Sequence, residues 1–169
     1  MSEIVSINKK GIREDIMALE NAVINHAGSF IGDSEVCPLK HSFSDGMYVR
    51  EIFIPAGTIL VGKIHKHAHP NFLMKGEVEV ITESNKREHL VAPLSMISPS
   101  GTKRVVRAIT DTVWVTVHEN KKNTTNLKNL EEEIISPDYV SYQKFIDGNA
   151  GTGRRMLSFV KTLFKKLLK

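Results

Sequence analysis

Hydrophobic positions in this sequence follow two different periods, and each period covers its own stretch of the chain. Within residues 11–26 the apolar residues recur at helical spacing, which predicts one amphipathic helix. From residue 47 to residue 119 the period changes to two, and β-branched residues collect between turn signals such as Pro55-Ala56-Gly57. Short strands with no helical stretch between them predict a mainly β protein built as an antiparallel barrel or sandwich.

The remaining segments flank this strand-rich region. A chain of 169 residues is expected to fold as one domain. Residues 1–44 hold the helix and a lead-in, and residues 45–120 form the predicted barrel. Residues 121–147 predict two short helices separated at Pro137. Residues 148–169 comprise a Gly-rich joint and a tail.

Cysteine content and apolar run lengths indicate the compartment. The single cysteine, Cys37, cannot form an internal disulfide, and we interpret it as a buried or incidental thiol. The first residues lack the charged-then-apolar order of a secretion signal, and no apolar run reaches membrane-spanning length. We therefore expect a cytoplasmic protein.

The basic charge is concentrated in residues 154–169. The chain has a formal net charge of +4, and this segment holds six cations and no acid. Without it, 17 Lys and Arg oppose 19 Asp and Glu, a formal charge of −2, so nucleic acid is not an expected partner of the folded part. The segment has the pattern of a basic amphipathic helix, which would dock on a membrane surface, on a protein partner or on the protein's own barrel.

Candidate chemistry gathers in one strand of the barrel. On a strand alternate residues share a face, so Val61, Lys63 and His65 point the same way, with His67 next in the series. Imidazoles and an ammonium group are not typical fillers of an apolar core. The strand is therefore expected to line a functional site.

The same segment resembles the first motif of the cupin superfamily, in which two glycines bracket a His-x-His pair and a glutamate. With Gly57 and Gly76 on the two glycines, Lys63 stands at the first histidine, His65 at the second and His69 at the glutamate. The resemblance implies a single cupin-type antiparallel β-barrel, a jelly roll, with an N-terminal helix and C-terminal helices.

The second cupin motif, Pro-x-Gly-x-x-His, resembles Pro99-Ser-Gly101-Thr-Lys-Arg104, with arginine at the histidine position. Longer strings, among them GKIHKHAHPNFLMKGEVEV and APLSMISPSGTKRV, are similar to a family of small cupin-like proteins encoded by bacteriophages. That similarity extends over most of residues 45–142. It implies a viral origin and a location in the host cytoplasm, at the inner membrane or in the virion.

Two of the positions that bind metal in cupins carry Lys63 and Arg104. A charged side chain about 4 Å from another like charge is repelled by about 4 kcal/mol at an effective dielectric of 20, so these residues disfavour a divalent metal. With His65 and His69 they predict a positive pocket for a phosphate, a carboxylate or a sugar nucleotide. A metal held by His65, His69 and His118 is the alternative, with His67 assigned to the rim.

Acid–base chemistry is a further alternative, because some cupins catalyse reactions without metal. His65, Glu51 and His118 are the candidate catalytic residues. A purely structural interpretation pairs Lys63 and Arg104 with barrel glutamates instead. Trp114 is interpreted as a core or dimer contact.

These observations favour a phage-type accessory protein, expected to be a homodimer, that binds a small anionic ligand in the barrel. One alternative is a cupin enzyme, an isomerase, oxygenase or hydrolase. The other is a non-catalytic virion or membrane-associated scaffold that acts through the basic amphipathic tail.

Overall fold

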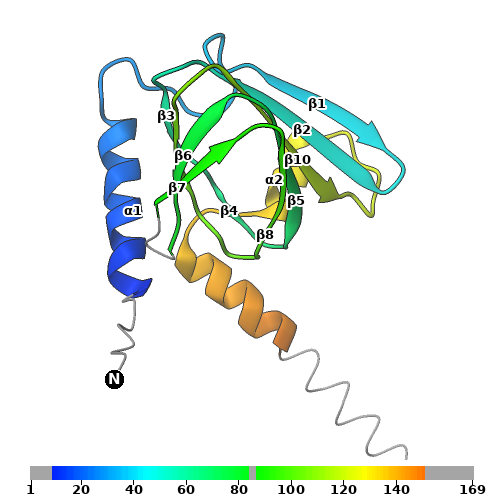
Figure 1. Cartoon of the computed structure of the whole chain (residues 1–169). Helices are drawn as coiled ribbons and strands as arrows, with labels where there is room; N and C mark the ends of the chain where they lie inside the picture. Colours follow the sequence, from blue (N-terminus) through cyan, green and yellow to red (C-terminus); the bar gives the residue numbers. More distant parts are fainter. Residues whose placement is uncertain (1–8, 84–86, 151–169) are drawn as a thin grey trace, which may run out of the picture.

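The computed structural model describes residues 9–83 and 87–150 and shows a mainly β protein with a helix at each side of its strands (Figure 1). The elements in chain order are α1 (Lys9–Ile24), β1 (Leu39–Ser44), β2 (Met47–Ile54), β3 (Ile59–Val61), β4 (Ile64–His65), β5 (His69–Lys75), β6 (Glu77–Ile81), β7 (Arg87–Val91), β8 (Leu94–Ser98), β9 (Val105–Ala108), β10 (Thr112–Glu119), α2 (Leu127–Ile134) and β11 (Ile135–Ser136). A last helix occupies residues 139–150, where the description ends.

The strands form two main antiparallel sheets. One has the order β1-β2-β10-β5-β8 and the other the order β3-β9-β6-β7, while β4 and β11 make a separate pair. The long strand β10 lies between β2 and β5, with Trp114 paired to Ile52 on one side and to Leu73 on the other. Residues from chain-distant strands therefore meet on one inner face.

The two sheets enclose an apolar core. Its buried members come from both sheets, which therefore pack face to face: Leu73, Val78, Val80, Val106 and Trp114. Period-two alternation sends these residues inward while their neighbours face outward. The predicted fold class, a cupin-type jelly roll with an N-terminal helix and C-terminal helices, is confirmed, although the two sheets stay separate rather than closing into one barrel.

Helix α1 is attached to the sheets by a buried ion pair. Ile16 is buried on its apolar face, and Glu20 on the same helix accepts from Lys103 Nζ at 2.7 Å. The Lys103 side chain is only 2 % exposed, so the pair is shielded from solvent on the lysine side. Farther along, the Arg13 guanidinium lies 4.4 Å from the ring centre of Tyr139, which connects α1 to the last helix.

Two of the motif glycines occupy positions that a side chain would disrupt. Gly76, in the turn between β5 and β6, has φ +93°, and a Cβ there would lie 2.5 Å from the carbonyl oxygen of Asp111. Gly101 has φ +78°, and a Cβ there would lie 2.3 Å from the Tyr142 ring. The Gly101 amide donates to the His65 carbonyl at 2.8 Å, so this close approach also holds the histidine strand.

Some expectations lie elsewhere or outside the described residues. Strand β1 falls within the part of the chain assigned to a lead-in. It is short, only Leu39 and Phe43 are apolar, and it is an edge strand that pairs only with β2. Within residues 9–83 and 87–150, no helix has the length and apolar character needed to cross a bilayer. The predicted tail helix, residues 154–169, lies outside the described residues.

Candidate functional site

The inner face of the five-stranded sheet changes from apolar to ionisable in three successive rows. The first row aligns Ile52, Trp114 and Leu73 across β2, β10 and β5. The second aligns Arg50, Thr116 and Asn71 in the same strands. Alternation then brings Tyr48, His118 and His69 to the third row. Polar side chains thus line one end of the space between the sheets.

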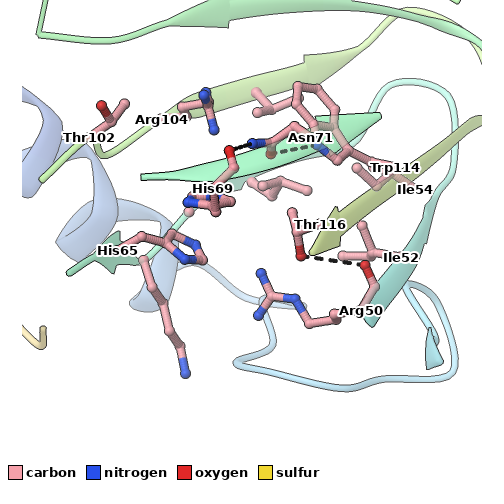
Figure 2. A pocket seen from close by; sticks show the side chains of 14 residues that line it. Arg50, Ile52, Ile54, His65, His69, Asn71, Thr102, Arg104, Trp114 and Thr116 are labelled. Atoms are coloured by element: carbon pink, nitrogen blue, oxygen red, sulfur yellow. Dashed lines mark hydrogen bonds between the residues drawn. The ribbon is translucent and has the colours of Figure 1, made fainter. Parts of the chain in front are cut away.

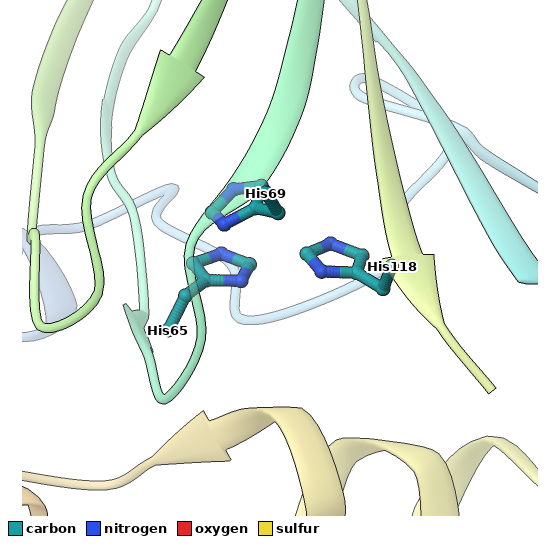
Figure 3. Close-up of side chains that lie close together, drawn as sticks. All are labelled: His65, His69 and His118. Atoms are coloured by element: carbon teal, nitrogen blue, oxygen red, sulfur yellow. The ribbon is translucent and has the colours of Figure 1, made fainter. Parts of the chain in front are cut away.

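Three buried histidines meet at this end (Figure 3). His118 closes β10, His69 begins β5, and His65 belongs to β4, which β11 pairs through Ile135. The rings of His65 and His118 are stacked with centres 4.9 Å apart, and the His69 ring centre lies 4.2 Å from the first and 4.5 Å from the second. One ring nitrogen from each lies within 4.8 Å of the others. This separation of the three ring nitrogens is compatible with a shared ligand or metal ion.

Burial keeps these imidazoles neutral at physiological pH. Desolvation is the main cause that lowers the pKa of His69 to about 4 and that of His118 to about 3. Desolvation likewise lowers the pKa of His65, and the neighbouring histidines and arginines lower it further. Neutral imidazoles each offer one lone pair, which is the form that binds a metal.

Each of the three histidines has a buried ring nitrogen without a hydrogen-bond partner. His69 Nδ1 lies 3.2 Å from the carbonyl oxygen of His67, which can only accept, so Nδ1 carries the proton and donates. That tautomer leaves the lone pair on His69 Nε2. This atom, His65 Nδ1 and His118 Nε2 are buried without a hydrogen-bond partner. Buried polar atoms are normally satisfied, so the cluster has the donor set of a metal or ligand site.

A cavity of about 100 Å³ adjoins the histidines (Figure 2). Its lining combines apolar side chains of both sheets, such as Ile54 and Val106, with the cationic residues Arg50, Arg104 and Lys63. No carboxylate belongs to this lining, which consists entirely of described residues. Lys63 is paired with Glu131 outside this lining, and Glu83 and Glu88 favour the charged form of Arg104 from a distance. Arg50 has no carboxylate as an ion-pair partner among the described residues.

Arg104 is held over the cavity by a chain of hydrogen bonds. Its Nη2 donates to Ser98 Oγ, and Asn71 Nδ2 donates to the same oxygen at 2.5 Å. Trp114 Nε1 in turn donates to Asn71 Oδ1 at 3.0 Å, and the Arg104 guanidinium lies 5.9 Å from the centre of the Trp114 ring. Burial lowers the pKa of Arg104 from its usual value, although an arginine stays charged.

Arg50 is a site residue that the sequence analysis missed. It lies on the inner face of β2 between Tyr48 and Ile52, and its guanidinium points toward the cavity (Figure 2). Burial lowers its pKa, and within residues 9–83 and 87–150 no carboxylate forms an ion pair with it. The alternation in MYVREIFI could have found it, because Tyr48, Ile52 and Ile54 on the same face are apolar or aromatic.

The other predicted site residues are not all brought to the cavity. Lys63 lies at the rim, where its side chain is 43 % exposed and its ammonium pairs with Glu131 of α2 rather than with a barrel glutamate. Glu51 lies on the outer face of β2, opposite Arg50 and the cavity. His67 occupies the exposed loop between β4 and β5, with its ring edge-on to Phe145 at 5.3 Å.

Trp114 and Cys37 are both buried, Trp114 as part of the core and the cavity wall. Burial raises the pKa of the Cys37 thiol, which makes it less reactive. Trp114 is thus a core residue and not an exposed contact.

No protein-family model matches this chain, and no curated protein sequence matches it. Solved structures are similar in fold. KdgF from Halomonas sp. is 14 % identical, with 57 % of this chain and 92 % of that chain covered and a TM-score of 0.45. Ectoine synthase from P. lautus is 16 % identical, with 70 % and 86 % covered and a TM-score of 0.49.

A third similar structure is an RmlC-like cupin family protein with a double-stranded β-helix fold from Methanocaldococcus jannaschii. It is 15 % identical, with 58 % of this chain and 93 % of that chain covered and a TM-score of 0.44. Identities at this level do not transfer an activity, and the resemblance to bacteriophage proteins stays a prediction.

Proposed function

We propose that this cupin-fold protein binds a small anion in the cavity between Arg50 and Arg104. The observation that carries the proposal is the pair of half-buried guanidinium groups in a cavity whose lining contains no carboxylate. A buried charge without a counter-charge is costly, and guanidinium groups bind carboxylates and phosphates through paired hydrogen bonds. An incoming anion would supply the missing compensation.

The size of the cavity limits the ligand. Its volume of about 100 Å³ is below the roughly 150 Å³ of an engineered cavity that accepts benzene. A phosphate or a short carboxylate therefore suits the enclosed part, whereas a sugar nucleotide could place only its anionic group there. The apolar lining, with Ile52, Ile54 and Leu60, favours a ligand with one charged end.

Calorimetric titration of the full chain with phosphate, formate and acetate tests the proposal. We expect saturable binding of at least one of these anions, weakened tenfold or more in Arg50→Gln and Arg104→Gln because each variant removes a charge-assisted hydrogen bond. Arg107→Gln is the matched control, because Arg107 is exposed and pairs with Glu79 on the other sheet. Equal affinities in all three variants, or no binding of any anion, would disprove the proposal.

A metal centre at the three histidines is the second candidate. The buried nitrogens of His65, His69 and His118 lack partners, and their imidazoles are neutral, so these residues fit a transition metal such as zinc, iron or nickel. Such an ion would supply Lewis-acid or redox chemistry for an isomerase, oxygenase or hydrolase. The nearby guanidinium groups oppose a divalent cation, so a bound anion would raise the affinity of the site for metal.

Metal analysis of the purified protein separates the two candidates. A metal centre predicts about one ion per chain in the wild type, and a Co²⁺ visible spectrum that His118→Ala loses. His26→Ala is the control, because His26 is exposed and far along the chain from the cluster. Purified protein that contains no metal but still binds anions would exclude the metal centre and support the anion pocket.

Two further roles are proposed from the sequence alone. They are an accessory role in a phage and the docking of residues 154–169 on a membrane or a partner. Sedimentation with anionic liposomes, with and without these residues, tests the membrane version. Equal sedimentation of the two chains would discard it.

A further inference from the structure

We infer that the outer face of the β1-β2-β10-β5-β8 sheet is the contact between two copies of this chain. The inference is independent of the proposed ligand. It starts from strand β10, whose side away from the core is entirely apolar over three residues. Trp114 is buried with Thr112, Thr116 and His118 on the inner side, whereas Val113, Val115 and Val117 on the opposite side are partly exposed.

The neighbouring strands continue this apolar side. In the register of the sheet, Val115 is paired with Phe72 on β5, Val113 with Phe53 on β2, and Val117 with Val49. Pro70 on β5 is paired with Ile97 on β8. The outer face is defined by these outward-pointing residues and their strand neighbours: Met47, Val49, Phe53, Pro70, Phe72, Met74, Ile97, Val113, Val115 and Val117.

Exposure shows that the described part of the chain leaves this face open. Ile97 is 65 % exposed, Met74 59 % and Met47 47 %. Helix α1 lies on the side of β3, β6 and β7, away from β1 and β2 (Figure 1), and the buried residues of α2 pack against Tyr48 on the inner side. A contiguous apolar patch of this kind is rare on a monomer.

The shape, size and charge of the face suit a second copy. With about 4.8 Å between strands and about 3.3 Å per residue, a five-stranded sheet with strands of up to eight residues has a footprint of roughly 600 Å². A standard interface uses about 800 Å² of accessible surface per partner, which a corrugated footprint of this size approaches.

Two twisted sheets pack well through β-branched faces, and a two-fold axis brings identical faces together. The charged residues on the outer face also suit this arrangement. Lys40 and Glu51 are neighbours across β1 and β2, and among the described residues neither forms an ion pair. A two-fold axis that brings Lys40 of one copy to Glu51 of the other would pair these charges across the contact, while the exposed Lys75 opposite Val113 would lie at its edge.

Sedimentation velocity of the full chain at micromolar concentrations tests this contact. We expect a dimer for the wild type, and a dissociation constant raised roughly 100-fold in Val115→Lys and in Phe72→Lys, since each lysine enters a two-fold interface twice without a partner. Ile59→Lys is the matched control, because Ile59 is 50 % exposed on β3 of the other sheet. Its dissociation constant should equal that of the wild type.

Circular dichroism melts of the same variants identify any loss of fold, and Phe72 is already 36 % exposed, so its substitution leaves the core intact. A monomeric wild type, or a dimer that persists in both folded variants, would overturn the inference. So would a wild-type monomer that dimerises only after residues 154–169 are removed, because the tail would then be the occupant of the outer face.

Discussion

The two ends of the space between the sheets are built from the same strands but have opposite chemistry. Strand β5 contributes Leu73 to the apolar end and His69 to the polar end, and β10 contributes Trp114 and His118 in the same way. Apolar burial stabilises the fold, whereas buried imidazole and guanidinium groups cost free energy until a ligand compensates them. The contrast indicates that the apolar end maintains the structure and the polar end serves binding.

The largest expected effect lies at the apolar end. Leu73→Ala should lower the free energy of unfolding by about 2–5 kcal/mol, because a fully buried leucine leaves a cavity when it is truncated. Urea unfolding measures the loss. Ile59→Ala, at a position of the other sheet that is 50 % exposed, serves as the control and should lose much less. Similar losses in both variants would contradict the assignment of the core.

Acid should destabilise the protein through the polar end. An unfolded histidine titrates near pH 6.5, whereas His69 and His118 titrate near 4 and 3 in the folded state. Since the folded pKa values are depressed, the unfolded chain binds more protons, and stability falls as the pH drops from about 6.5 toward these values. Each histidine contributes up to about 1.4 kcal/mol per pH unit.

Thermal melts between pH 7.5 and 5 measure this slope, in buffers of constant ionic strength. His69→Gln and His118→Gln should each flatten it, while His26→Gln, at an exposed position, should leave it unchanged. An equally steep slope in the cluster variants would show that other groups control the acid response.

An apolar substitution at the polar end should change the free energy of unfolding differently from a truncation at the apolar end. Arg50→Met, tested without added anions, should raise the free energy of unfolding by about 1 kcal/mol, because it removes a half-buried charge that lacks an ion-pair partner among the described residues. Arg87→Met is the control at an exposed arginine paired with Glu79. Destabilisation by Arg50→Met would mean that the guanidinium has a structural partner and is not reserved for a ligand.

The smallest effect is expected at the rim. Lys63→Met should change the free energy of unfolding by less than about 1 kcal/mol, because its ion pair with Glu131 is solvent-exposed. Anion affinity measured by calorimetry should fall less than in Arg104→Gln. A loss as large as that of Arg104→Gln would place the Lys63 ammonium at the ligand.

Sequence patterns predicted the fold better than they predicted the site. Alternation in residues 112–119 separated two faces correctly, but it could not say which was buried, since valines on one side and Trp114 on the other both look like core. Only the sheet order shows that the side with the threonines and His118 faces inward. The pairing of β10 with β5 brings the chain-distant His118 to His65 and His69, which are close together in the sequence, and this pairing is not encoded locally.

The sequence also could not show whether the cationic side chains point into the cavity or away from it. Spacing placed Lys63 and Arg104 at cupin ligand positions, yet the ammonium of Lys63 turns to an acid on α2, and Arg50 supplies inward charge from β2. A lysine at the end of a strand can reach either side, so its orientation depends on which acids the tertiary fold brings near.

The most direct test of the anion pocket uses Trp114, which is the only tryptophan in the chain and lines the cavity. Its indole N–H donates to Asn71, next to the Ser98 hydroxyl that holds Arg104. Titration of ¹⁵N-labelled protein with the anion that binds in calorimetry should move the indole resonance saturably, with the same dissociation constant, and in Arg104→Gln the shift should require at least tenfold more anion. An indole resonance that stays fixed while the anion saturates the protein would place the binding elsewhere and contradict the account.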